Sequence, residues 1–340
     1  MNDLPDLLVV GAGPVGLACA VEASRQGLSH VVIEKGTLLN TLVGWPTFTV
    51  FFSTPDLLEI GGIPFVTAGA KPTRREGLVY YRKVAERFGL NVRLSESVEN
   101  VQRTDEGFLV TTSRGSHRAR KVVVATGFFA GPNILGVPGE GLLKCSHYYT
   151  EPFACAFRDV LVVGGKNSAV EAALDLHRHG ARVTMAVRKP EFGASVKYWL
   201  KPDIENRVKE GSITAHFETT VDSVQEGSVT LRKNGTAFTI PNDTVFFLTG
   251  FRPDFDFLKR IGIHVDEALH LSYDESTMET NVPGLYVAGV VAAGVDIGRF
   301  FIENGRLHAV QIARHAAGSL GRKPVDAAPP LPLAAFQDGD

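Results

Sequence analysis

The chain has 340 residues, of which 44% are hydrophobic and 21% charged, a composition typical of a globular protein long enough for about two domains. Its 35 basic and 37 acidic residues leave a net charge of −2, which gives no electrostatic basis for binding nucleic acid or an anionic membrane surface. No hydrophobic run approaches the ~18 residues of a membrane span, and the first residues lack the pattern of a signal peptide, so we expect a cytoplasmic protein.

The first 34 residues follow the order strand, glycine turn, helix, strand and acid, with strands at 7–10 and 31–33 and the turn at 11–16. Gly11 permits a tight turn, Gly13 lets the backbone approach a pyrophosphate, and Gly16 lets the helix pack closely on the strand. Glu34 lies 23 residues after Gly11, near the ~20-residue offset at which an acid binds ribose hydroxyls. This combination predicts a dinucleotide site.

The next segment, residues 36–75, is rich in Thr, Gly, Pro and Phe, and an irregular region of this length is usually functional. A helix is predicted at 77–88. Short strands are predicted after it, at residues 91–93, 98–103, 108–112 and 117–120. An apolar strand then ends in Ala125-Thr126-Gly127.

A second strand, glycine turn and helix begin at Asp159, with the turn at Gly164-Gly165-Lys166. The next strand ends at Arg188-Lys189, 24 residues after Gly164, where the first unit has an acid. An acid would repel a 2′-phosphate, whereas a guanidinium pairs with one. The first unit therefore suits FAD and the second NADPH.

More short strands are predicted between residues 211 and 250, and a helix at 300–320. The remaining residues, 323–340, are rich in Pro and Ala and are expected to form a flexible tail. The three cysteines are too few and too scattered for a disulfide framework or a zinc site, and no metal is expected.

The two glycine turns and the strand ending in Ala125-Thr126-Gly127 resemble the pyridine nucleotide disulfide oxidoreductase superfamily, and residues 5–320 resemble its low-molecular-weight thioredoxin reductases. Residues 280–289 resemble the late strand that returns the chain to the FAD domain in this superfamily. The resemblance implies an α/β fold of two Rossmann-like, three-layer ββα dinucleotide-binding domains, with the NADPH domain inserted in the FAD domain. It implies a homodimer and the following limits: FAD domain 1–133 and 252–322, NADPH domain 134–251, tail 323–340.

The chain is still more similar to the bacillithiol disulfide reductase-like branch of that superfamily. The segments that carry this similarity are Phe51-Phe52-Ser53, Ile63-Pro64-Phe65, Leu78-Val79-Tyr80-Tyr81-Arg82, His147-Tyr148-Tyr149, Gly164-Gly165-Lys166-Asn167-Ser168-Ala169 and Phe301-Ile302-Glu303-Asn304-Gly305.

Two features depart from these relatives. That branch carries a functional cysteine between Pro14 and Gly16, where this chain has Val15. The Cys-x-x-Cys of thioredoxin reductases would fall near Cys145-Ser146-His147-Tyr148, which holds one cysteine and so cannot form an internal disulfide. Cys19 and Cys145 are the alternative thiols, and both positions are more typical of a protein core.

No catalytic residue is assigned from the sequence. Cofactor contacts are predicted at Gly11, Gly13, Pro14, Gly16, Glu34, Lys35, Val98, Ala125, Thr126, Gly127, Gly164, Lys166, Asn167, Ser168, Arg188, Lys189, Gly250, Gly289, Val290 and Ile302. Lys166 replaces a glycine and either binds phosphate or weakens the site. Related reductases have an Asp where this chain has Val290, so that either Asp296 or backbone amides take its place.

The predicted function is an FAD-dependent NADPH oxidoreductase that passes hydride to FAD and then electrons to an external acceptor, which is a disulfide, a quinone or a small redox protein. The alternatives are a flavin monooxygenase, a ferredoxin or flavodoxin reductase, and a non-catalytic redox sensor. No nucleic acid or membrane partner is expected.

Overall fold

A computed structural model describes residues 4–129, 131–296 and 298–325. The chain divides into two compact units, and the second is inserted in the first. Unit 1 holds the described residues up to Val43, Phe48–Gly131 and those from Phe251 onward; unit 2 holds Gly44–Thr47 and Pro132–Gly250. The segments β8 (Gly131–Pro132) and β17 (Phe251–Arg252) lie where the chain passes between the two units.

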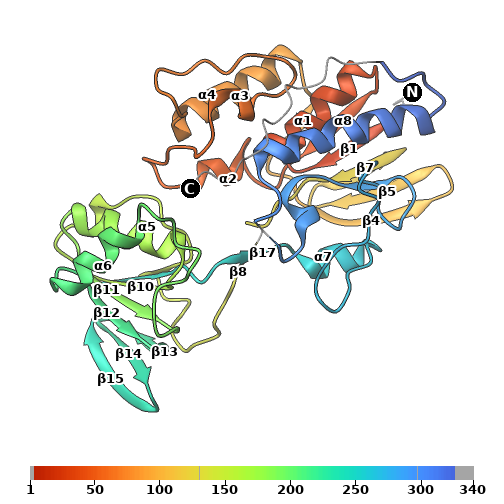
Figure 1. The fold of residues 1–340 in the computed structure, drawn as a ribbon. Coiled ribbons are helices and arrows are strands. Elements are labelled where there is room, and N and C mark those ends of the chain that lie inside the picture. The colour runs from red at the N-terminus through yellow and green to blue at the C-terminus, as the bar shows by residue number, and fades with distance from the viewer. Residues whose placement is uncertain (1–3, 130, 297, 326–340) are drawn as a thin grey trace. The chain divides into compact units, whose positions relative to one another are not determined.

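Unit 1 is built on a five-stranded parallel sheet in the order β18-β7-β1-β2-β3. These strands are Leu285–Val287, Lys121–Val124, Leu7–Val10, His30–Ile33 and Val92–Arg93. All four residues of β1 are buried, because a central parallel strand is covered on both faces. The helices α1 (Pro14–Arg25) and α8 (Ile302–Ser319) lie together over this sheet (Figure 1).

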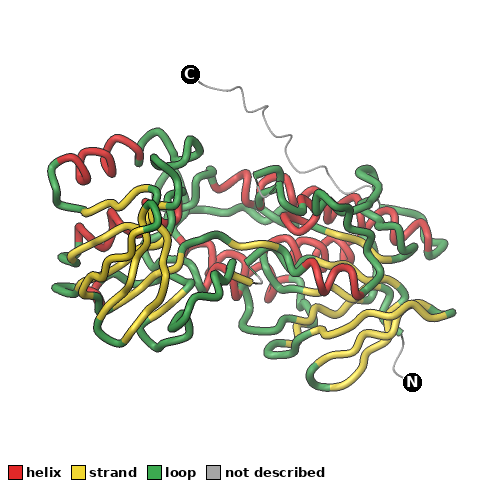
Figure 2. Tube along the Cα trace, turned by 90° about the horizontal axis from the view of Figure 1, so that it is seen from below, coloured by secondary structure: helices red, strands yellow, loops and turns green. Residues whose placement is uncertain are grey.

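A second sheet of unit 1 is antiparallel and joins β4 (Val98–Thr104), β5 (Gly107–Thr112) and β6 (Gly115–Ala119). Phe108 and Val110 of β5 are buried and alternate with less buried neighbours, the pattern of a strand with one face on the core. Figure 2 shows strands in yellow, helices in red and the many loops and turns between them in green. Unit 1 therefore has the helix, parallel sheet and antiparallel sheet that the sequence predicts.

Residues 36–75, expected to be irregular, contain two short helices, α2 (Asn40–Val43) and α3 (Pro55–Leu58). The helix predicted to start at residue 77 is α4 (Arg74–Arg87), which begins three residues earlier. Thr73 explains the difference, because its side chain accepts a hydrogen bond from Glu76 N while the Glu76 carboxylate accepts one from Thr73 N.

Unit 2 repeats the plan of unit 1 with a parallel sheet in the order β12-β11-β10-β16-β9. These strands are Thr214–Phe217, Arg182–Val187, Asp159–Val163, Thr244–Phe247 and Cys145–Ser146. The antiparallel sheet consists of β13 (Thr219–Gln225), β14 (Ser228–Lys233) and β15 (Thr236–Pro241). The helices are α5 (Asn167–Arg178) and α6 (Lys201–Lys209).

The alternation of side chains along β10 shows the layers of unit 2. Val160 and Val162 pack in a core with residues of α5, such as Val170 and Leu174. Leu161 and Val163 face the opposite way and pack with residues of the antiparallel sheet, such as Val229 and Leu231. The predicted class, α/β with three-layer ββα units, is confirmed.

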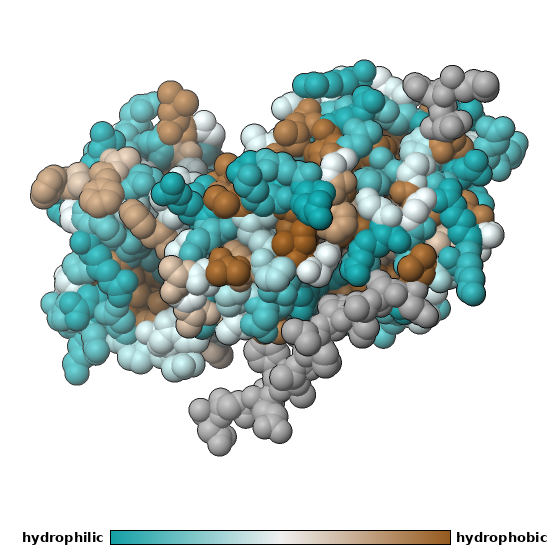
Figure 3. Space-filling model, turned by 90° about the horizontal axis from the view of Figure 1, so that it is seen from above, coloured by the Kyte–Doolittle hydropathy of each residue, from teal (hydrophilic) through white to brown (hydrophobic). Residues whose placement is uncertain are grey.

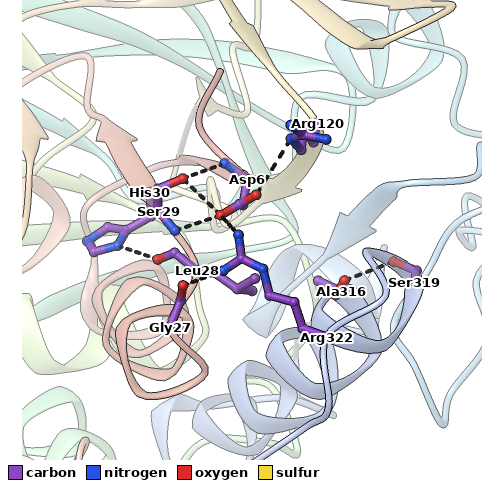
Figure 4. Close-up of polar contacts among 9 residues, drawn as sticks. All are labelled: Asp6, Gly27, Leu28, Ser29, His30, Arg120, Ala316, Ser319 and Arg322. Atoms are coloured by element: carbon purple, nitrogen blue, oxygen red, sulfur yellow. Dashed lines mark hydrogen bonds and ion pairs between the residues drawn. The ribbon is translucent and has the colours of Figure 1, made fainter. Parts of the chain in front are cut away.

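The remaining elements are η1 (Phe153–Cys155), α7 (Phe255–Arg260) and η2 (Gly289–Ala293). After α8, Val325 is still hydrogen-bonded, because its N and O pair with the Gln26 amide at 2.8 Å each. Arg322 contacts Asp6 and Gly27 (Figure 4). The rest of the predicted tail, residues 326–340, lies outside the described residues.

Exposed hydrophobic side chains do not form one continuous area on the face of the molecule in Figure 3, where teal hydrophilic residues separate the brown groups. Within the described part of the chain, no helix combines the length and apolarity needed to cross a membrane.

Candidate dinucleotide-binding sites

The first glycine turn joins β1 to α1 and leaves no room for side chains at two positions. Gly11 has a φ of +109°, and a Cβ on it would lie 2.6 Å from Ala125 O. A Cβ on Gly16 would lie 1.9 Å from Gly11 O. Both glycines are therefore required by the packing of turn, helix and neighbouring strand, as the sequence motif predicts.

Gly13 differs from the other two glycines because nothing outside its immediate neighbours along the chain lies within 4 Å of where its Cβ would be. Gly13 is the N-cap of α1 and has no side-chain cap, and Pro14 occupies the first helical position. The space beside Gly13 is thus open, and it lies at the positive end of the helix, where no side chain caps the first turn. This open cradle fits the pyrophosphate of a dinucleotide.

The Glu34 carboxylate lies at the carboxyl end of β2, directly beside this turn. One oxygen accepts from Ala12 N at 2.8 Å and the other from Gly36 N at 2.9 Å, and the residue is 7% exposed. A carboxylate offers about four lone-pair sites, so two stay available for ribose hydroxyls. The residues present therefore fit FAD, and the same carboxylate also fixes the turn.

Three distant segments meet at Val15, which follows Pro14 in the turn. A Cβ on Gly289 would lie 3.1 Å from Val15 Cγ2, and a Cβ on Gly305 would lie 3.3 Å from the same atom. Gly289 starts η2 and Gly305 lies in the first turns of α8. The Val15 side chain thus fills a small apolar junction between the first glycine turn, η2 and α8.

His308 of α8 contacts this junction through a hydrogen bond with Gly289. The N-H of Gly289 donates to His308 Nδ1 at 3.1 Å, and the imidazole is 6% exposed. Burial, together with the charge of Arg299, lowers the pKa of His308 from 6.5 to about 4. The ring is therefore neutral near pH 7 and accepts the Gly289 amide. The sequence analysis did not single out this histidine.

The other predicted contacts of unit 1 lie at several element ends. Ala125, Thr126 and Gly127 follow β7, Val98 starts β4, Ile302 starts α8, and Lys35 is exposed beside Glu34. Val290 Cγ1 is 3.9 Å from where a Gly127 Cβ would be. Asp296, the suggested replacement for an Asp at position 290, instead has its carboxylate 3.3 Å from His270 Nε2.

The second glycine turn, between β10 and α5, has the same close packing with different glycines. Gly164 has a φ of +142°, and a Cβ there would lie 2.6 Å from Leu248 O. A Cβ on Gly165 would lie 2.6 Å from Val187 Cγ1. Lys166 is the exposed N-cap of α5, so its side chain does not have to fit inside the turn.

Arg188 and Lys189 directly follow the end of β11 and are both exposed. Their cationic groups and that of Lys166 belong to loops at the carboxyl ends of adjacent parallel strands, the edge where such sheets bind nucleotides. This charge suits the phosphates of NADPH. Ser168 is exposed in the first turn of α5, and Gly250, with a φ of +96°, ends the unit.

Sequence reasoning missed a segment, residues 192–197, that folds over the second turn. Phe192 and Val196 are buried in the core of unit 2, and Gly193 N donates to Gly165 O at 2.9 Å. Asn167, predicted only as a cofactor contact, bonds this segment through both ends of its amide. The short run Gly193-Ala194-Ser195 was the available signal, since small residues allow backbone to lie close to backbone.

The three cysteines lie in environments that disfavour the reactive thiolate. Cys19 is buried in α1, Cys155 is buried in η1, and Cys145 is partly buried in β9. Burial raises the pKa of all three thiols. Among residues 4–129, 131–296 and 298–325, no group of three or more His, Cys, Asp or Glu side chains could hold a metal ion.

Residues 8–289 match the family model described as pyridine nucleotide-disulphide oxidoreductase. The chain is 41% identical over 313 residues to bacilliredoxin reductase Bdr of Bacillus subtilis, covering 91% of this chain and 97% of that protein. Its structure is similar to bacillithiol disulfide reductase Bdr of Bacillus cereus, with a TM-score of 0.90, 42% identity, and coverage of 93% and 100%. A thioredoxin reductase of T. acidophilum, 22% identical with a TM-score of 0.72 over 93% and 99%, shares the fold.

Proposed function

The chain belongs to the pyridine nucleotide-disulphide oxidoreductase family, and from that membership we propose that it transfers electrons from NADPH, through FAD, to a low-molecular-weight disulfide or the disulfide of a small redox protein. It is a flavin-dependent pyridine nucleotide oxidoreductase whose cofactors are FAD and NADPH. Bound FAD supplies the redox chemistry, accepting a hydride equivalent from NADPH and delivering two electrons.

The charged residues that follow the second strand of each unit support the cofactor part of this proposal. In unit 1 the second strand is followed by Glu34, which is buried and accepts a hydrogen bond from Ala12 N. In unit 2 the equivalent strand is followed by exposed Arg188 and Lys189. An acid suits ribose hydroxyls, whereas a pair of cations suits a 2′-phosphate. We therefore place FAD in unit 1 and NADPH in unit 2.

The acceptor part rests on the similarity to the two Bdr proteins, which are named for bacilliredoxin and for bacillithiol disulfide. The overall reaction is NADPH + RSSR + H⁺ giving NADP⁺ + 2 RSH. The hydride provides both electrons that break the S–S bond, one thiol takes the hydrogen of that hydride equivalent, and the other takes a proton from solvent.

No cysteine of the chain takes part as a relay in this proposal. The position between Pro14 and Gly16 is filled by Val15, which packs against Gly289 and Gly305. Burial raises the pKa of each thiol, and a protonated thiol is a poor nucleophile. The protein's part is then to hold donor and acceptor in alignment, which is a large share of catalysis in hydride transfer.

The test is NADPH oxidation by the FAD-loaded protein under argon, with bacillithiol disulfide, glutathione disulfide, a bacilliredoxin in disulfide form, a quinone and a ferredoxin as separate acceptors. The expected result is turnover with a disulfide and two thiols formed per NADPH. Turnover with quinone or ferredoxin alone contradicts the acceptor class. Formation of a hydroxylated product that requires air indicates a monooxygenase. Nucleotide binding without turnover under any condition indicates a sensor.

A further inference from the structure

We propose that Asn167 is a positioning residue for NADPH, which sets affinity by fixing residues 193–197 over the second glycine turn. These residues are called the clasp below. The inference rests on the proposed placement of NADPH in unit 2. It assigns to Asn167 a role distinct from the direct cofactor contact that the sequence motif suggests.

The two hydrogen bonds of Asn167 are the first observation. Its Nδ2 donates to Ser195 O at 3.0 Å, and its Oδ1 accepts from Lys197 N at 2.9 Å. The side chain therefore pairs with the clasp as a neighbouring strand would, although about 30 residues separate them in sequence. One N-H of the amide is already used in this way, which leaves a single N-H for any ligand.

The position of the clasp is the second observation. Gly193 N donates to Gly165 O at 2.9 Å, and a Cβ on Gly193 would lie 3.5 Å from both Gly165 O and Lys166 Cγ. The clasp thus rests on the turn that receives the pyrophosphate. It follows Arg188 and Lys189 after a few residues, so that one continuous segment begins at the 2′-phosphate site and ends over the pyrophosphate site.

Contacts that do not involve Asn167 also hold the clasp and the residue before it, so that the Asn167 amide affects the clasp locally. Phe192 is 3% and Val196 5% exposed in the core of unit 2. Lys197 Nζ lies 3.1 Å from Glu171 Oε1 on α5. Loss of the Asn167 amide therefore loosens the clasp without unfolding the unit, and the nucleotide must then order the clasp when it binds.

The experiment compares wild type, Asn167→Ala and Asn206→Ala as FAD-loaded proteins. Asn206 is an exposed position of α6, and its variant removes the same group from the same unit. Affinity for 2′,5′-ADP, which carries the 2′-phosphate but has no nicotinamide, is measured by calorimetry. Hydrogen exchange of residues 190–200 is measured without ligand by mass spectrometry.

We expect Asn167→Ala to bind 2′,5′-ADP about tenfold more weakly, with faster exchange in the clasp and normal exchange in β10 and β16. The KM for NADPH rises by a similar factor while kcat at saturation stays within twofold. Asn167→Asp, which keeps the acceptor for Lys197 N, recovers part of the protection in the exchange measurement. Asn206→Ala behaves as wild type in every measurement.

Two results overturn the inference while leaving the proposed function intact. In one, exchange in the clasp rises but affinity for 2′,5′-ADP is unchanged. In the other, affinity falls while the clasp stays protected, which makes Asn167 a direct contact. If wild type itself does not bind 2′,5′-ADP, the proposed placement of NADPH fails and the inference fails with it.

Discussion

Arg322 Nη2 donates to Asp6 Oδ2 at 2.7 Å, which joins the third residue after the end of α8 to the residue before β1 (Figure 4). Asp6 is 5% exposed, and the same oxygen also accepts from Ser29 N and Ser29 Oγ at 2.9 Å each. One carboxylate therefore ties the C-terminal helix to the entry of the central strand and to the turn before β2.

We expect Asp6→Ala to lower the free energy of unfolding by about 3 kcal/mol, because it removes a buried carboxylate that accepts charge-assisted hydrogen bonds from Ser29 and Arg322. Urea denaturation followed by circular dichroism measures this change. Arg118→Ala is the control, because Arg118 makes an exposed pair with Glu106 at 3.5 Å, worth about 0 to 1 kcal/mol. Equal effects of the two variants would contradict the structural role of Asp6.

Glu34 is expected to decide flavin retention. In Glu34→Gln the amide has one acceptor oxygen, so its NH₂ group faces either Ala12 N-H or Gly36 N-H, and a charged acceptor for ribose is lost. FAD affinity should fall at least tenfold, as measured by the flavin absorbance that remains after gel filtration. Glu99→Gln, the same change at an exposed position of β4, should retain FAD fully.

Arg188 is expected to distinguish NADPH from NADH. Each charge-assisted hydrogen bond to the 2′-phosphate contributes about 1.5 to 3 kcal/mol, so Arg188→Ala should lower the ratio of kcat/KM for NADPH over NADH about ten- to a hundredfold. Arg182→Ala, at the opposite end of the same strand and paired with Asp159, provides the control. An unchanged ratio in Arg188→Ala would refute the assignment of the 2′-phosphate site.

Local sequence determines the parts of these sites that were predicted. Gly11, Gly16 and Glu34 lie within one strand-turn-helix-strand unit, and each has a conformational or chemical requirement that only a few residue types meet. For the same reason the repeat at Gly164 and the charge change at Arg188 were recognised.

Contacts between distant segments were not predicted. The meeting of Val15, Gly289 and Gly305 joins residues almost 300 positions apart, and a valine in a glycine turn does not reveal what it touches. The bonds of Asn167 to the clasp also depend on how the loop after β11 folds back. Helix α6 was not predicted, because its amphipathic pattern is weak. Pro202 lies near its start, and Ile204 is its one buried residue.

His308 predicts a pH dependence of stability. Its folded pKa of about 4 lies below the unfolded value of 6.5, so the folded state binds fewer protons, and the stability from the neutral ring is present above pH 6.5 and lost as the pH falls toward 4. Between pH 7 and pH 5 this amounts to about 2 kcal/mol. The loss should appear in urea denaturation at the two pH values.

His308→Gln tests that assignment, because the glutamine oxygen can accept the Gly289 amide but does not titrate. The difference in unfolding free energy between pH 7 and pH 5 should shrink by about 2 kcal/mol in this variant. His264→Gln, at an exposed position, should keep the wild-type difference. A wild-type difference in His308→Gln would mean that other groups cause the acid sensitivity.

The absence of a cysteine relay is tested by the triple variant Cys19→Ala, Cys145→Ala and Cys155→Ala. The two buried thiols are 1% and 4% exposed, so alanine removes only a small group from each core. NADPH oxidation is measured with the acceptor that wild type prefers, after FAD content has been matched. Activity within a few-fold of wild type supports direct transfer.

The opposite outcome is equally specific. If the triple variant binds FAD and NADPH still bleaches its flavin absorbance, but the acceptor is no longer reduced, one of the thiols carries the second half of the reaction. Single variants then identify the thiol, and Cys145 is the first to examine because it is the least buried of the three. Val15→Cys provides the complementary measurement: with direct transfer, a thiol placed between Pro14 and Gly16 raises kcat by less than about twofold, since orientation rather than a nucleophile limits the rate.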